Sequence, residues 1–265
     1  MKRWKGLFYK EWMLARPGIA VVLIVILLAV ASGPFLLHQY ISGETSIISY
    51  AFGISSFLLL FLSYMPVAGL FMSLTADMKR LDLWLHSPAS LGTLVGVKAL
   101  FALIAMAAAM IWLTLVLGIV FLITGGSAGI PEGLTAGLFT GFFAEIELIV
   151  LVIAVIQLAI GFLFWTIYQW LRRKFTRIAA VPVTGLLFIA LFWVNEKLSG
   201  LPAAERVLGA GEFRFSSIER LSDYSDLGIE MTGALAAGGL IFSLIVSALF
   251  FWAGLALFDR KVAGE

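Results

Sequence analysis

The sequence lacks cysteine and is poor in charged residues. None of its 265 residues is cysteine, and only two are histidine. This composition excludes disulfides, thiolate metal sites and cysteine nucleophiles, and we expect no histidine-rich metal site. Lys, Arg, Asp and Glu together make up 13% of the residues, about half the share found in soluble domains. The composition therefore leaves no room for a separate soluble catalytic domain.

Motifs for nucleotide and zinc chemistry are also missing. No Gly-Lys pair occurs, so the chain has no Walker A loop with which to bind ATP. The His-Glu-x-x-His pattern of zinc proteases does not occur either. We therefore expect no metal, no cofactor and no ATP hydrolysis by this chain itself.

Apolar residues are abundant and are grouped in long runs. They make up 62% of the chain, and the mean hydropathy is +1.05. A helix of about 20 apolar residues crosses a bilayer. We expect an all-α polytopic membrane protein in which residues 1–265 form a single transmembrane domain. Six runs predict its spans, at about residues 17–37, 50–74, 99–123, 148–168, 178–194 and 231–257.

The distribution of basic residues predicts the orientation of the spans. An even number of spans places both termini on one side of the membrane. Lys and Arg number five before the first span, three between the second and third, four between the fourth and fifth, and two after the last. These fourteen of the 18 basic residues predict cytoplasmic termini by the positive-inside rule. The basic segment 172–177 fits this topology, so we expect no nucleic-acid partner.

Residues 1–16 have the pattern of an amphipathic helix lying in the inner interface of the bilayer. Trp4, Phe8 and Trp12 share one face, and the basic residues share the other, which suits contact with anionic headgroups. Glu11 projects into the apolar face, where an unpaired carboxylate is unfavourable. Two interpretations stay open: Glu11 contacts a basic residue of another subunit or of a cytoplasmic loop, or its carboxylate reaches water.

Glu145 and Glu147 interrupt the fourth apolar run, 138–168. A charge at the bilayer centre costs roughly 3 kcal/mol or more, so the span is predicted at 148–168 and both carboxylates at the outer rim. Residues 138–144 then form a short re-entrant or interfacial piece. The carboxylates either stabilise the rim or form a cation or substrate site at the outer mouth. Helical residues two apart point about 200° apart, which argues against an acid/base pair.

Residues 195–230 form a long segment on the predicted outer side. The segment is too apolar for a disordered linker, and we expect one or two short helices on the outer face.

A charged, helix-forming segment separates the second and third spans. Residues 77–86, projected on a helix, place Leu81, Trp84 and Leu85 on one side. Pro88 ends the pattern because it cannot donate a backbone hydrogen bond. The segment 75–88 is therefore predicted as a short amphipathic cytoplasmic helix. It either docks onto a partner or lies on lipid headgroups.

This layout resembles the ABC-2-type permeases, the membrane subunits of ATP-binding-cassette exporters. The similarity covers the whole chain as an order of elements. It is most specific in Asp77, Arg80, Leu81, Leu83 and Leu85, followed by Ser87-Pro88-Ala89-Ser90 and Gly96-Val97-Lys98. Tyr9-Lys10-Glu11 is similar to the Lys-Glu pair in the family's first helix. Trp84-Leu85-His86 departs from the family pattern, in which acidic or small residues are more usual.

The resemblance implies a partner that supplies energy. The coupling helix 75–88 would insert into a groove on an ABC ATPase subunit, of which two copies are expected. Asp77, Arg80, Leu81, Trp84 and Leu85 would transmit ATPase closure to the spans. Secondary contacts would come from Lys10, Glu11, Arg172 and Arg173. A second permease chain, identical or related, would complete a transporter of the bacterial plasma membrane that exports a drug, antimicrobial peptide or lipid.

Two other classes of function stay open. One is a membrane-embedded sensor or assembly protein whose cytoplasmic helix binds a different partner. The other is an intramembrane enzyme that uses Glu145 or Glu147, although the sequence offers no convergent second group for it.

Overall fold

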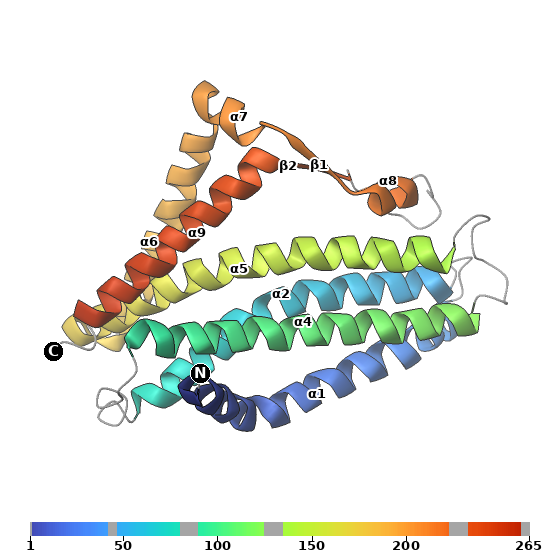
Figure 1. Ribbon diagram of the computed structural model, residues 1–265, viewed down its shortest axis with the longest axis horizontal. Helices are drawn as coiled ribbons and strands as arrows, with labels where there is room; N and C mark the ends of the chain where they lie inside the picture. Colours follow the sequence, from blue (N-terminus) through green and yellow to red (C-terminus); the bar gives the residue numbers. More distant parts are fainter. Residues whose placement is uncertain (1, 42–46, 80–89, 125–134, 223–232, 261–265) are drawn as a thin grey trace. The chain divides into compact units, whose positions relative to one another are not determined.

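The protein is an all-α, multi-pass membrane protein, as predicted. The computed structural model describes residues 2–41, 47–79, 90–124, 135–222 and 233–260. Eight helices and one two-stranded sheet lie in these ranges (Figure 1). Six of the helices are long and apolar enough to cross a membrane: α1 (Lys2–Tyr40), α2 (Ile47–Met78), α4 (Leu91–Thr124), α5 (Ala136–Lys174), α6 (Arg177–Ser199) and α9 (Ala237–Phe258).

The helices contribute to two compact units. The first consists of Met1–Pro66, Phe101–Ala154 and Arg214–Ala234, and the second of Val67–Leu100, Val155–Phe213 and Leu235–Glu265. Three of the five boundaries fall within α2, α4 and α5, so each of these helices supplies residues to both units.

The first unit is built around a cluster of phenylalanines. Phe52 of α2 lies against Phe142 and Phe143 of α5, with ring centroids 5.2 and 5.1 Å apart. Phe121 of α4 stacks on Phe139 at 4.6 Å. The short helix α8 (Ser216–Ser222) adds the buried side chains of Ile218 and Leu221 to this core.

The second unit has an aromatic stack between α5 and α9. The ring of Trp165 lies 6.5 Å from that of Phe162 and 5.8 Å from that of Phe258. Gly254 allows α9 to approach, because a Cβ there would lie 2.8 Å from the ring of Phe162. The short helix α7 (Pro202–Leu208) packs against α9 within the same unit (Figure 1).

Helix α1 joins the predicted interfacial helix and the first span without a break. It runs from Lys2 to Tyr40 and includes Pro17 and Pro34. Its first turns run in a different direction from the remainder (Figure 1). A proline in a helix interior removes one hydrogen bond and bends the helix, and Pro17 lies where the two predicted segments meet. The boundary predicted between residues 16 and 17 is thus a bend within one helix.

The prediction of a separate re-entrant or interfacial piece at 138–144 is wrong. These residues belong to α5, which is one helix of 39 residues, about 58 Å long. Phe139, Phe142 and Phe143 are buried in the phenylalanine cluster. Because protein covers this face, the helix does not need lipid around it and continues past the thickness of the bilayer core.

The predicted external segment contains two short helices, α7 and α8, as expected, and it also contains a strand that pairs with residues of the predicted last span. Strand β1 (Glu212–Arg214) pairs with β2 (Ala234–Ala236). The amide of Phe215 donates to the carbonyl of Gly233 at 2.7 Å beside this pair. The last span therefore begins at Ala237, not at Met231 as predicted.

Candidate functional site

The predicted coupling segment begins inside helix α2. Residues 75–78 are the last residues of that helix, and α4 begins at Leu91. Residues 80–89 lie outside the described residues, and they include Arg80, Leu81, Trp84 and Leu85. The proposed contacts of these four side chains stay predictions. The structure does describe the two helix ends between which the segment runs.

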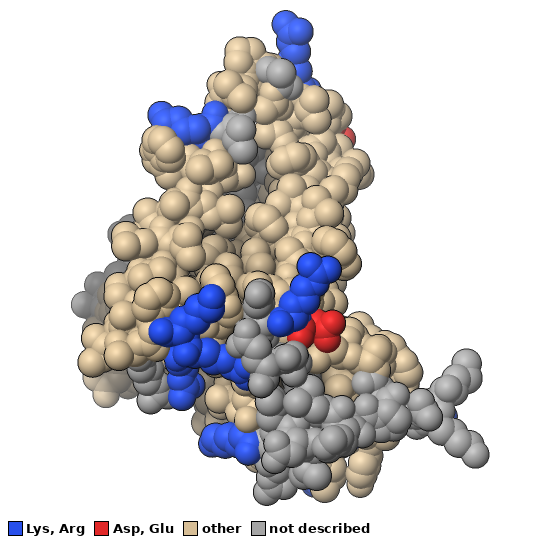
Figure 2. Space-filling view, turned by 90° about the vertical axis from the view of Figure 1, so that its left-hand side faces the viewer, with Lys and Arg blue, Asp and Glu red and all other residues tan. Residues whose placement is uncertain are grey.

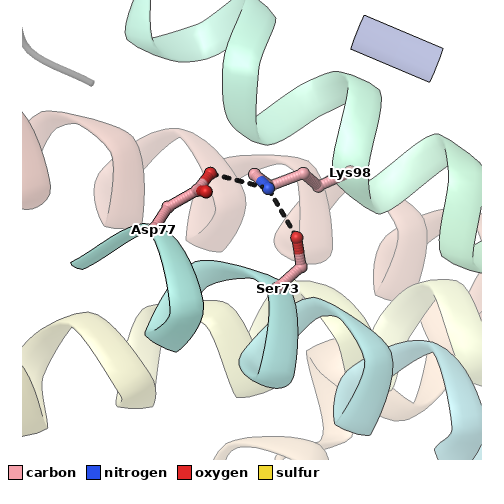
Figure 3. Close-up of polar contacts among 3 residues, drawn as sticks. All are labelled: Ser73, Asp77 and Lys98. Carbon is pink, nitrogen blue, oxygen red and sulfur yellow. Dashed lines mark hydrogen bonds and ion pairs between the residues drawn. The ribbon is translucent and has the colours of Figure 1, made fainter. Parts of the chain in front are cut away.

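An ion pair joins these two helix ends (Figure 3). The ammonium nitrogen of Lys98, on α4, lies 2.8 Å from Oδ2 of Asp77, on α2. The same nitrogen donates a hydrogen bond to the hydroxyl of Ser73 at 2.5 Å. Ser73 and Asp77 are four residues apart on one helix face, so both can face Lys98.

The ion pair is largely closed off from solvent. The side chain of Lys98 is 4% exposed and that of Asp77 is 14% exposed. A buried charge that loses its partner is strongly unfavourable, so each side chain holds the other in place. The pair therefore fixes the end of α2 to the first turns of α4, on both sides of the segment 80–89.

This geometry gives Asp77 a role that the sequence did not indicate. Its carboxylate is directed at Lys98 within the chain, so it holds the base of the segment in position. Lys98 and Ser73 were not predicted to pair with it. One feature of the sequence could have indicated the pairing: Lys98 lies seven residues inside the apolar helix α4. A charged residue within a membrane span generally has a partner.

The N-terminal part of α1 packs against α4 within the first unit. The ring of Phe8 lies 5.3 Å from that of Phe101 in an edge-to-face arrangement. Glu11 is only 5% exposed, so the interpretation in which its carboxylate reaches water is wrong. Lys10 is exposed, and Trp4 and Trp12 are nearly half exposed.

The basic residues predicted as secondary contacts lie at the C-terminal end of α5. Arg172 and Arg173 are exposed in its last turn together with Lys174. Figure 2 shows Lys and Arg side chains projecting from a surface that consists mainly of other residues. The ammonium of Lys174 lies 4.9 Å from the ring centroid of Trp170, a cation–π distance. Cations are favourable at the C-terminal end of a helix.

Glu145 holds the start of helix α8. Its Oε2 accepts hydrogen bonds from the backbone N–H groups of Ser217 and Ile218, each at 3.0 Å. These are N–H groups of the first helical turn, which have no partner within the helix. The carboxylate thus stabilises α8 in the manner of an N-terminal cap.

Glu147 binds a different element. The hydroxyl of Thr114, on α4, donates a hydrogen bond to its carboxylate. The two glutamates are thus directed at α8 and at α4, as expected for helical residues two apart. Their carboxylates do not converge on one point, and this arrangement fits stabilisation of the rim better than acid/base chemistry. No group of three or more His, Asp or Glu within the described ranges is placed to hold a metal ion.

Comparisons of the chain with protein-family models, with curated proteins and with solved structures find no match. The resemblance to the ABC-2-type permeases therefore depends on the motifs and the order of elements in the chain itself.

Proposed function

We propose that this chain is the permease subunit of an ABC-2-type exporter, driven by a separate ATPase subunit through the segment 75–88. The observation that supports this proposal best is the Asp77–Lys98 ion pair at the base of that segment. A partner that moves residues 80–89 would move the ends of α2 and α4 together, because the pair joins them.

Both helices extend far beyond the ion pair. α2 has 32 residues and α4 has 34, and each supplies residues to both compact units. ATP binding would close the ATPase subunits and favour one arrangement of the spans over another. A rigid junction at the base of the segment is what such a population shift requires, since a loose junction would absorb the movement.

The remaining parts of the proposal follow from the resemblance. Two ATPase copies and a second permease chain, identical or related, would form the complete transporter. Both termini would lie in the cytoplasm of a bacterial cell. The apolar lining expected of such a pathway suits a hydrophobic or amphipathic substrate, such as a drug, an antimicrobial peptide or a lipid.

The alternative functions receive less support. An intramembrane enzyme would need carboxylates that converge on a substrate, but Glu145 binds α8 and Glu147 binds Thr114. A sensor or assembly protein would also use the cytoplasmic segment for docking, so only the identity of the partner separates it from a permease.

Purification from native membranes in mild detergent tests the proposal. We expect the wild-type chain to co-purify with an ATP-binding subunit that has vanadate-sensitive hydrolysis. Leu81→Asp, in the coupling segment, should remove both the subunit and the hydrolysis. Leu201→Asp makes the same change on the predicted outer side, at a side chain that is 51% exposed, and should retain both. A folded wild-type preparation with no such subunit would contradict the permease assignment.

A further inference from the structure

A groove lies between the N-terminal part of α1 and α4, within the first unit. Its volume is about 480 Å³, within the range of small-molecule sites. Phe8, Trp12 and Ile19 line it from α1, and Phe101 and Ile104 line it from α4. Lys5 is the charged residue of the lining.

The groove has a cationic end and an apolar length. Lys5 and Ile19 are fourteen residues apart on α1, or about 21 Å along the helix. Lys5 lies near the start of α1, in the segment predicted to be interfacial, and Ile19 lies beyond Pro17 in the predicted first span. The length compares with the depth of one leaflet's hydrocarbon, about 15 Å. An occupant with a charged head and an extended apolar tail fits this shape.

The groove is open on the side that would face lipid. Ile104 is 48% exposed and Trp12 is 45% exposed, whereas Phe101 is buried and forms the floor with Phe8. Phospholipid acyl chains are the apolar molecules available at such an opening in a membrane.

Charge selects among the lipids. The sequence places Lys2, Arg3, Lys5 and Lys10 in the first ten residues. A basic residue near a membrane surface attracts anionic headgroups by about 1 kcal/mol. A zwitterionic headgroup carries no net charge and gains little from Lys5.

We propose that this groove binds an anionic phospholipid, with its phosphate at Lys5 and one acyl chain lying between α1 and α4 toward Ala108. The site orders a specific lipid against the bend in α1. It does not depend on whether the chain couples to an ATPase.

The absence of cysteine from the chain makes a direct test possible. Ala108→Cys, at the apolar end of the groove, carries a small fluorophore in full-length protein reconstituted into vesicles. Phosphatidylglycerol or phosphatidylcholine with brominated acyl chains is then titrated into the vesicles, and quenching gives the relative binding of the two lipids. Leu115→Cys is the matched reporter, since Leu115 is exposed on the same helix two turns further on and does not line the groove.

We expect the reporter at residue 108 to show a preference for phosphatidylglycerol, and the reporter at residue 115 to show none. Lys5→Gln should reduce the preference about fivefold, the equivalent of 1 kcal/mol. Arg16→Gln removes an exposed charge of α1 outside the groove and should leave the preference within about twofold.

Five outcomes would overturn the proposal. The same preference for phosphatidylglycerol at both reporters would indicate ordinary bilayer contact. The absence of any lipid preference at residue 108 would indicate the same. An equal loss in Lys5→Gln and Arg16→Gln would indicate a diffuse surface potential. An unchanged preference in Lys5→Gln would place the headgroup elsewhere. Quenching at residue 115 but not at 108 would show that protein, such as a second copy of this chain, fills the groove.

Discussion

At the scale of single residues, four of the charged side chains within the long helices have defined polar partners. Lys98 binds Asp77 and Ser73, Glu145 binds the first amides of α8, and Glu147 binds Thr114. Burying an ionised group without a partner is costly in an apolar environment. Each partnership joins two different elements, so these polar contacts fix how the helices meet.

Loss of Asp77 should destabilise the protein. Asp77→Ala removes the carboxylate that pairs with the buried ammonium of Lys98, and the free energy of unfolding should fall by about 3–5 kcal/mol. Asp77→Ala/Lys98→Met removes both charges and should recover much of this loss. Denaturant titration of purified protein in detergent, followed by tryptophan fluorescence, measures both variants. A single variant within about 1 kcal/mol of wild type would show that the pair contributes little.

Glu145→Gln should loosen the start of α8. The neutral amide accepts weaker hydrogen bonds from Ser217 and Ile218, by about 1 kcal/mol in total, so exchange of these two amides should accelerate about fivefold. Hydrogen exchange followed by mass spectrometry measures the exchange rate of the amides in this segment. Glu147→Gln is the control, because its partner is Thr114, and it should leave exchange in α8 unchanged. If both variants accelerate exchange in α8 equally, Glu145 is not its cap.

At the scale of elements, the start of α9 lies very close to α7 within the second unit. The amide of Gly238 donates to the carbonyl of Ala210 at 2.8 Å. A Cβ at Gly238 would lie 1.9 Å from the carbonyl oxygen of Val207, in α7. That oxygen belongs to the backbone and cannot rotate away, so only glycine allows α7 and α9 to meet in this way.

Gly238→Ala should therefore separate α7 from α9. We expect a lower thermal unfolding midpoint and faster amide exchange at residues 237–238. Gly185→Ala, within α6, is the matched control because nothing lies within 4 Å of its Cβ position. Alanine is favoured over glycine in a helix by up to about 1 kcal/mol, so this variant should be as stable as wild type or slightly more stable. A Gly238→Ala protein with the wild-type midpoint would contradict the packing described here.

The elements differ in how far the sequence could predict them. Long apolar runs predict spans directly, and all six correspond to helices. The full length of α5 could not be predicted, because residues 138–144 are helical through contacts with Phe52, far away in the sequence. The pairing of β1 with β2 joins three-residue strands that are about twenty residues apart. Strands this short show no alternating pattern of apolar and polar residues from which the pairing could be predicted. The charge of Lys98 within an apolar helix could have suggested that it has an acidic partner. The identity of that partner, Asp77, is set by the packing of α2 against α4.

At the scale of the whole molecule, the charge distribution makes a definite prediction about topology. Lys174→Cys lies at the end of α5, predicted to be cytoplasmic, and Glu205→Cys lies in α7, predicted to be external. Both side chains are exposed. A membrane-impermeant maleimide applied to intact cells should label only the cysteine at residue 205, and permeabilised cells should label both. Labelling of residue 174 in intact cells would reverse the orientation.

The central claim is that residues 80–89 contact an ATPase subunit. Site-specific photo-crosslinking from residue 84 tests this contact most directly, with p-benzoylphenylalanine in place of Trp84. Trp252, which is 67% exposed on α9, provides the same aromatic replacement outside the segment. The account predicts an adduct with an ATP-binding subunit from residue 84 and none from residue 252. A folded, membrane-inserted chain whose residue 84 crosslinks only to lipid, or to a protein without ATPase activity, would contradict it.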